Sequence, residues 1–202
     1  MGDDILPFIL FEDGKYKLHP PAIDFLSQLE HPFATMSCAG KFRTGKSFMI
    51  NRLLRNPPSK GFGVGETVQA CTRGIWLCRT PLQGGGVNVF VMDTEGIDAL
   101  DAESDHDVRI FAIAVLLSTV VVYNSMSHLD EAAIQTLSLM TRVAESLGTG
   151  HTPTLYWVLR DFMLQLVGLD GKPMSHADYL EDALKNPIGS KCKTREAIHT
   201  IF

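Results

Sequence analysis

The stretch Gly40-Lys41-Phe42-Arg43-Thr44-Gly45-Lys46-Ser47 matches the phosphate-loop pattern G-x-x-x-x-G-K-[ST] at every fixed position. It lies between an apolar run at 33–38, which predicts a strand, and a run at 47–54, which predicts a helix. Glycines in such a loop let main-chain N–H groups turn toward phosphate oxygens, and the helix N-terminus adds its dipole. Lys46 would bring a positive charge to the β- and γ-phosphates, and the Ser47 hydroxyl suits Mg²⁺. The stretch therefore predicts a site for a nucleoside triphosphate and Mg²⁺.

Patterns of strands and helices alternate along the rest of the chain. Residues 5–18 predict a hairpin, Ser127 to Asp130 resembles a capping box, and 59–73 and 93–107 have the composition of loops. The alternation predicts an α/β fold of the P-loop NTPase type, with a mostly parallel central sheet and helices on both faces. The one antiparallel exception expected is 75–79 beside 87–92, because the linker is too short for a crossover helix. The predicted strands are 33–38, 75–78, 87–92, 119–123 and 155–159. The predicted helices are 23–29, 47–54 and 128–147, and residues 110–117 are predicted to be the end of a further, buried helix.

Asp93-Thr94-Glu95-Gly96 directly follows the predicted strand 87–92. In a phosphate-loop fold this is the Walker B position, where Asp93 would hold Mg²⁺ through a water and the Gly96 N–H would approach the γ-phosphate. Taken alone, the pattern also fits an ordinary acidic turn after a strand. Its place after the phosphate loop and a strand favours the metal-binding interpretation.

A threonine is needed to complete the Mg²⁺ shell, and Thr67 and Thr72 both lie in the intervening loop. Thr72 precedes the strand expected to pair with 87–92, which is where a γ-phosphate-sensing switch lies in such folds. We therefore favour Thr72. The alternative is a threonine at the edge of a strand.

The guanine-reading pattern N-K-x-D is absent from the sequence, but Arg160-Asp161 follows the predicted strand 155–159. A carboxylate there can accept hydrogen bonds from both N1–H and the 2-amino group of guanine. Adenine offers neither donor and would leave the acceptor unpaired. A surface Arg-Asp pair fits the same spacing, so position alone leaves both interpretations open.

Composition and charge limit the classes of partner. Lys plus Arg total 18 against 23 Asp plus Glu, which gives a net charge of −5, and 45% of the residues are hydrophobic. This composition is typical of a folded domain, and its acidic balance argues against binding nucleic acid through phosphate neutralisation. We therefore expect no nucleic-acid partner.

The four cysteines and seven histidines form no zinc-binding pattern, so reduced thiols in a cytoplasmic protein are expected. The N-terminal residues 1–4 lack the basic region of a signal peptide. The longest apolar run, 110–123, is shorter than the ~20 residues that a membrane span needs. Membrane association is accordingly expected only in a longer, full-length protein.

Several motifs together resemble the guanylate-binding protein family, relatives of the atlastins among the dynamin-like large GTPases. The likeness runs from about Pro7 to the end of the chain. The resemblance implies that 1–202 is a GTPase domain of the dynamin-like type, ending before a guanine cap and a C-terminal helical domain. The motifs are FRTGKS at 42–47, TVQ at 67–69, TRGIW at 72–76, DTEG at 93–96, AVLLS at 114–118, VYNS at 122–125 and LRDF at 159–162.

The resemblance also implies roles for individual residues. Arg43 matches an internal arginine finger that acts when two domains meet head to head, and Thr72 matches the switch threonine. Glu95 matches a residue that helps to position the attacking water, and Arg160-Asp161 matches the guanine-reading pair. The implied ligands are GTP or GDP with Mg²⁺, and the implied protein partner is a second copy of the chain.

The predicted site residues fall into three groups. The nucleotide-binding residues are Gly40, Phe42, Arg43, Thr44, Gly45, Lys46, Ser47, Phe48, Thr72, Asp93, Gly96, Arg160 and Asp161. The catalytic residues are Arg43, Thr72 and Glu95. The metal ligands are Ser47, Thr72 and Asp93.

Ala70 departs from the family pattern, since many members carry a serine there near the attacking water. A methyl group cannot hydrogen-bond that water. Two functions of different class therefore stay open. One is a GTPase activated by nucleotide-dependent dimerisation, and the other is a GTP-gated assembly module with little or no hydrolysis. A small-molecule kinase would need an arginine-rich lid, which residues 162–202 do not resemble.

Overall fold

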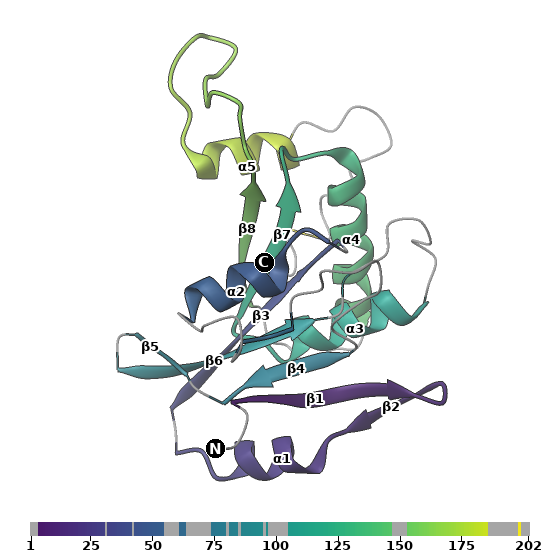
Figure 1. Ribbon diagram of the computed structural model, residues 1–202. Coiled ribbons are helices and arrows are strands. Elements are labelled where there is room, and N and C mark those ends of the chain that lie inside the picture. Colours follow the sequence, from purple (N-terminus) through teal and green to yellow (C-terminus); the bar gives the residue numbers. More distant parts are fainter. Residues whose placement is uncertain are drawn as a thin grey trace.

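Eight strands form one twisted sheet within the described residues (Figure 1). The computed structural model describes residues 4–30, 32–41, 43–54, 61–63, 74–79, 81–84, 86–94, 96, 105–146, 153–185 and 198. The strands are β1 (Ile5–Glu12), β2 (Lys15–Leu18), β3 (Phe33–Gly40), β4 (Ile75–Cys78), β5 (Leu82–Gly84), β6 (Val87–Thr94), β7 (Val120–Met126) and β8 (Thr154–Arg160). Their order in the sheet is β2-β1-β4-β6-β3-β7-β8, and β5 pairs with β6.

The strands β6, β3, β7 and β8 form the parallel half of the sheet. Because β3 lies between β6 and β7, the phosphate loop that follows β3 emerges between the carboxyl ends of its two neighbours. Ligands of open α/β sheets bind at this edge of the sheet, where the strand order reverses. The predicted α/β fold with a parallel central half is confirmed.

The other half of the sheet is antiparallel. The predicted hairpin is formed by β1 and β2, and its turn residues Asp13 and Gly14 have φ angles of 52° and 74°. Two consecutive positive φ angles are typical of the tight turns that join twisted strands. The predicted antiparallel pairing of β4 with β6 is confirmed, but it is not the one exception, because β1–β4 and β5–β6 are antiparallel too. The three-residue β5 was not predicted, because it is very short and ends in the glycine-rich segment 84–86, whose composition favours a turn.

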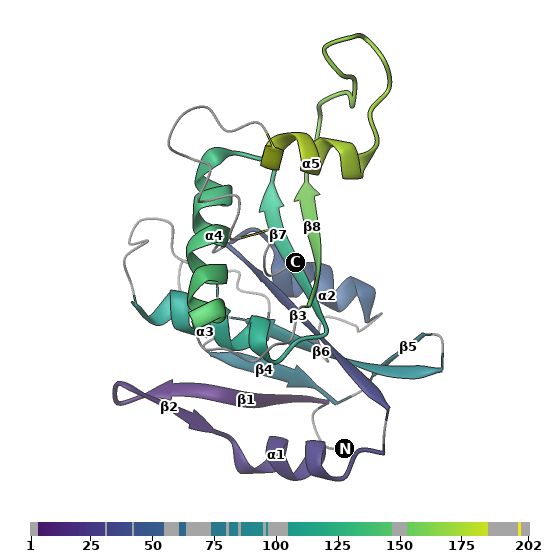
Figure 2. The ribbon, with the colours of Figure 1, turned by 180° about the vertical axis from the view of Figure 1, so that it is seen from behind.

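Helices cover both faces of the sheet, as predicted (Figures 1 and 2). On one face lies α2, and on the other lie α3 and α4, while α1 runs beside β1 and α5 lies across the carboxyl ends of β7 and β8. No helix of the described chain is long and apolar enough to cross a membrane. The helices are α1 (Pro20–Ser27), α2 (Lys46–Leu53), α3 (Asp105–Leu116), α4 (Glu131–Ser146) and α5 (His176–Lys185).

Alternate residues of the central strands pack into hydrophobic cores on opposite faces of the sheet. On β7, Val122 packs toward α2, whereas Val121 and Tyr123 pack toward α3 and α4. This alternation follows from the two-residue repeat of a strand. It also sends Cys38 and Val91 to the α2 face, where both lie in one core cluster with Ile50 of α2.

The N-terminal cap of α4 differs from the sequence expectation, and α5 was not expected. The α4 helix begins at Glu131, where Asp130 Oδ1 accepts a hydrogen bond from the Ala133 N–H at 2.5 Å. Ser127 is not its cap, because Ser127 has a positive φ of 67° and lies before the helix. A reciprocal capping box instead begins α5, where the Ser175 hydroxyl accepts from the Asp178 N–H and Asp178 Oδ2 accepts from the Ser175 N–H. The expected end of this helix, at residue 147, lies outside the described residues.

Candidate functional site

The phosphate loop begins where β3 ends and continues into the first turn of α2. Gly40, Arg43 and Gly45 have positive φ angles of 143°, 62° and 77°. Turns of this kind direct main-chain N–H groups to one side and so create a concavity for an anion. Glycine adopts these angles readily, whereas a non-glycine residue such as Arg43 is strained there, as is common at functional sites.

Lys46 lies inside the loop and is only 6% exposed. Its Nζ donates a hydrogen bond to the Lys41 carbonyl at 3.1 Å. The same carbonyl accepts from the Thr44 hydroxyl at 2.9 Å and from the Thr44 N–H at 3.4 Å. The loop therefore curls around the Lys46 ammonium, and this places a buried positive charge where a phosphate would enter.

Ser47 and Asp93 meet beneath the loop. The Ser47 hydroxyl donates to Asp93 Oδ2 at 2.5 Å, and Asp93 is fully buried at the end of β6. A hydroxyl and a carboxylate are the hard oxygen ligands that Mg²⁺ accepts. These two predicted metal ligands, 46 positions apart in the sequence, are brought together by the parallel pairing of β3 with β6. The residues fit a Mg²⁺ site.

Cys38 lies on the wall behind this pair. Burial, and then the neighbouring Asp93 carboxylate, raises the pKa of the Cys38 thiol far above its ordinary value. The thiol is therefore protonated and unreactive at neutral pH. It fills space on the α2 face as a small apolar group.

Arg160, the last residue of β8, turns toward the phosphate loop. Its Nη1 donates to the Thr44 carbonyl at 2.9 Å and lies 3.5 Å from the Gly45 carbonyl. Its guanidinium also lies 5.9 Å from the centre of the Phe48 ring, on the first turn of α2. Asp161 follows with an exposed carboxylate and a φ of 54°. Within the described chain Arg160 thus contacts the loop, and no ion pair joins it to Asp161.

Several predicted residues have no described position. Phe42, Thr67, Ala70, Thr72 and Glu95 lie outside the described residues, so their predicted roles stay predictions. Gly96 lies two residues after the end of β6, and its predicted approach to the γ-phosphate also stays a prediction. The predicted residues that the structure gathers around one site are Gly40, Arg43, Thr44, Gly45, Lys46, Ser47, Asp93 and Arg160.

Asn124 is a residue of this site that sequence reasoning missed. It lies at the end of β7, is fully buried, and donates from Nδ2 to both the carbonyl and the hydroxyl oxygen of Thr44. The sequence held a usable signal, because an amide at the carboxyl end of a strand beside β3 lies at the ligand-binding edge of the sheet.

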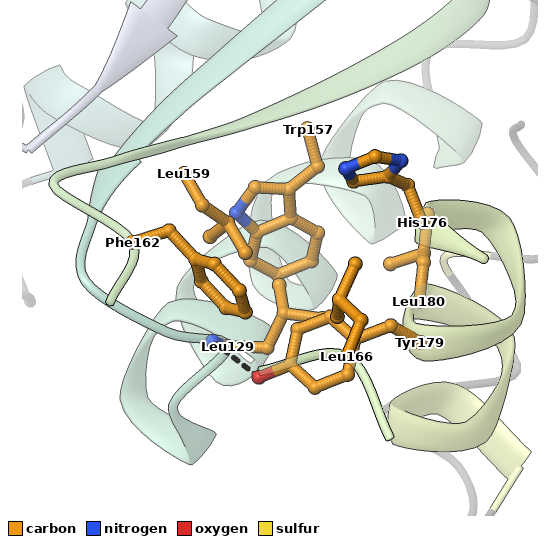
Figure 3. Close-up of a pocket in the computed structure, with 8 residues that line it drawn as sticks. All are labelled: Leu129, Trp157, Leu159, Phe162, Leu166, His176, Tyr179 and Leu180. Atoms are coloured by element: carbon orange, nitrogen blue, oxygen red, sulfur yellow. Dashed lines mark hydrogen bonds between the residues drawn. The ribbon is translucent and has the colours of Figure 1, made fainter. Parts of the chain in front are cut away.

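An apolar cavity of about 200 Å³ lies on the far side of β8 (Figure 3). The side chains of Trp157 and Leu159 enter it from β8, whereas Arg160 points to the opposite face. The Tyr179 hydroxyl at its edge accepts a hydrogen bond from the Leu129 N–H at 3.4 Å. The cavity is therefore separate from the phosphate loop. Its lining residues are Leu129, Trp157, Leu159, Phe162, Leu166, His176, Tyr179 and Leu180.

Gly45→Ala is expected to weaken GDP binding by about tenfold or more, because the new Cβ would overlap Nη1 of Arg160 and displace it from the loop. The φ of +77° adds strain of about 1–2 kcal/mol for any residue with a side chain. Gly171→Ala is a matched control, since Gly171 has the same φ but open space around it. Thermal unfolding and fluorescent-nucleotide titration should show both variants losing stability and only Gly45→Ala losing affinity. Equal GDP affinities of Gly45→Ala and Gly171→Ala would show that the contact of Arg160 with the loop does not support nucleotide binding.

Comparison with known proteins identifies the family. The family model "Guanylate-binding protein, N-terminal domain" matches residues 13–202. Guanylate-binding protein 3 of Mus musculus is 35% identical over 97% of this chain and 35% of its own length. Guanylate-binding protein 5 of Homo sapiens is 34% identical over 91% of this chain and 34% of its own length. The chain thus spans about a third of the length of these relatives, and it belongs to the guanylate-binding protein family.

Proposed function

We propose that this chain binds GTP with Mg²⁺ and hydrolyses the γ-phosphate. The observation that carries the proposal is the meeting of the Ser47 hydroxyl with the buried Asp93 carboxylate beneath a loop that encloses the Lys46 ammonium. The names of the relatives support guanylate as the ligand class. The motif pattern and the loop geometry support a triphosphate.

Binding of the phosphates rests on two sources of positive potential. Lys46 supplies a full charge, and the main-chain N–H groups at the N-terminus of α2, which begins at Lys46, add partial positive charge beside it. Both are fixed before the ligand arrives, so little reorganisation is needed on binding. In this proposal Ser47 and Asp93, together with Thr72, would hold Mg²⁺, which neutralises charge on the β- and γ-phosphate oxygens when bound.

Hydrolysis requires a water to add to the γ-phosphorus while the bond to the bridging oxygen breaks and GDP leaves. Glu95 is proposed to help position that water. Arg43 is proposed to stabilise the charge that develops on the transferring group. The Arg43 side chain is exposed at the rim of the loop, which supports a role completed by contact with a second copy of the chain. The proposed activity therefore depends on nucleotide-dependent dimerisation.

Guanine selection is assigned to Asp161, with Arg160 beside it. Asp161→Asn is expected to weaken GTP binding by about 10²-fold or more and to raise the affinity for xanthosine triphosphate. An amide cannot accept both hydrogen bonds of the guanine edge, but its NH₂ can donate to the xanthine oxygen. Competition titration of the two nucleotides measures the change, with Asp170→Asn in the following loop as control. An unchanged preference for GTP would refute the role of Asp161.

A GTP-gated assembly module with little hydrolysis is the second candidate, and Ala70 is the observation that favours it. Turnover of GTP and of ATP, measured across a range of protein concentrations, separates the two. The proposed enzyme hydrolyses GTP in preference to ATP, with a rate per molecule that rises with concentration. Binding and self-association without turnover would favour the assembly module. A cytoplasmic location, the absence of a nucleic-acid partner, and membrane association only through a longer protein are also proposals.

A further inference from the structure

Asn124 connects the end of β7 to the phosphate loop by two hydrogen bonds. Its Nδ2 donates to the Thr44 carbonyl at 2.9 Å and to Thr44 Oγ1 at 2.8 Å. Asn124 also pairs with Gly40 in the parallel pairing of β3 with β7. A Cβ added at Gly40 would overlap the main-chain carbonyl of Asn124. The end of β7 therefore lies directly against the loop at both ends of the 40–44 segment.

The direction of the amide follows from a chain of hydrogen bonds. The Thr44 hydroxyl donates its proton to the Lys41 carbonyl, so its oxygen can act only as acceptor toward Asn124. That carbonyl also accepts from Lys46 Nζ. Asn124 is thus linked through Thr44 to the same oxygen that holds the Lys46 ammonium.

The Thr44 carbonyl accepts from two neighbouring strands at once. Asn124 of β7 and Arg160 of β8 each donate to it at 2.9 Å, which uses both of its lone pairs. Because the peptide unit is planar and trans, the N–H of Gly45 points opposite to this carbonyl. Fixing the carbonyl against β7 and β8 therefore directs the Gly45 N–H away from the strands and toward the inside of the loop.

We propose that Asn124 is a positioning residue for phosphate binding, which acts by orienting the Thr44–Gly45 peptide so that its N–H faces the β-phosphate. Asn124 Oδ1 is buried and has no hydrogen-bond partner in the described chain, which is unfavourable for stability. The two hydrogen bonds that Nδ2 donates to Thr44 are therefore what favours an asparagine at position 124. This inference rests on the proposed binding of a guanine nucleotide.

The matched variants are Asn124→Ala and Ser125→Ala. Ser125 is the next residue of β7 and accepts a hydrogen bond from Trp157 Nε1 at 2.8 Å on the opposite face of the sheet. Each variant removes a buried hydrogen-bonding side chain from the same strand. Asn124→Ala should weaken GDP and GTP binding by about tenfold or more, whereas Ser125→Ala should leave the affinities within about twofold.

Three measurements test the proposal: nucleotide affinity, the thermal midpoint of the nucleotide-free protein, and hydrogen exchange of the Gly45 amide in the GDP complex. We expect faster exchange of the Gly45 amide in Asn124→Ala and in the isosteric Asn124→Asp, in which a carboxylate oxygen would replace the donating Nδ2 and face the Thr44 oxygens. Equal losses of affinity in Asn124→Ala and Ser125→Ala, in proportion to stability, would overturn it. Wild-type protein that binds no GDP would instead refute the proposed function.

Discussion

Lys46→Ala is expected to reduce GTP and GDP affinity by at least about 10²-fold, to below detection in a fluorescent-nucleotide titration. The reason is the position of the ammonium, which is 6% exposed and held on the Lys41 carbonyl inside the loop. A charge fixed in a place with little water interacts with phosphate far more strongly than one at the surface.

Lys17→Ala is the matched control for that variant. Lys17 lies on β2, half-exposed, and forms a surface ion pair with Glu12 at 3.0 Å. Surface pairs of this kind contribute little, so stability and nucleotide affinity should both stay close to wild type. Nucleotide binding by Lys46→Ala within a few-fold of wild type would mean that the triphosphate does not occupy this loop.

Arg43→Ala is expected to slow GTP hydrolysis by about 10²-fold or more while changing nucleotide affinity by only a few-fold. Arg43 is exposed, and its φ of 62° is equally strained for alanine, so the substitution changes the side chain and not the backbone preference. In the proposed mechanism the Arg43 side chain stabilises charge that develops in the transition state, so removing it should lower kcat without raising KM.

Protein concentration supplies the second measurement for Arg43. The rate per molecule of the wild type should rise with concentration, and Arg43→Ala should lose this rise. Arg43→Lys keeps the positive charge but loses the planar guanidinium with its several N–H donors, so its hydrolysis rate should stay far below that of the wild type and only slightly above that of Arg43→Ala. Arg142→Ala, an exposed arginine of α4, is the control for removal of a surface charge. Hydrolysis by Arg43→Ala at the wild-type rate would exclude Arg43 as an arginine finger.

Much of the fold could be predicted because local chemistry and tertiary contacts agree in it. The phosphate-loop motif fixes a strand before it and a helix after it, and β3 and α2 lie there. The Asp13-Gly14 turn supports the β1–β2 hairpin for a local reason, since both residues tolerate positive φ. Such signals need no knowledge of distant residues.

The errors arose where several local signals compete. Ser127 and Asp130 both suit a helix N-cap, and only the backbone decides between them: Ser127 N–H donates to the Arg160 carbonyl, which holds it in the turn after β7. The α5 helix was missed although Ser175 and Asp178 have capping-box spacing. The hydrogen bonds from the Ser175 hydroxyl and N–H lower the pKa of Asp178 below its ordinary value, because they favour the charged carboxylate.

Individual residues of the candidate site could be predicted from the sequence, but the hydrogen bonds between them could not. Sequence could place Ser47 and Asp93 after a loop and a strand, and the structure adds their direct hydrogen bond. The contacts of Asn124 and Arg160 with the Thr44 carbonyl depend on the register of β3 with β7 and of β7 with β8. A one-residue shift in either pairing would send these side chains to the other face, and a single sequence does not fix that register.

Whether this chain binds guanine nucleotides through the phosphate loop is tested by calorimetric titration of the folded protein with GTP and with ATP, each with Mg²⁺. We expect heat that saturates at one GTP for each chain, with ATP binding at least about 10²-fold more weakly because Asp161 would be left unpaired against adenine. Absence of heat with GTP, from protein whose thermal unfolding is cooperative, would contradict it.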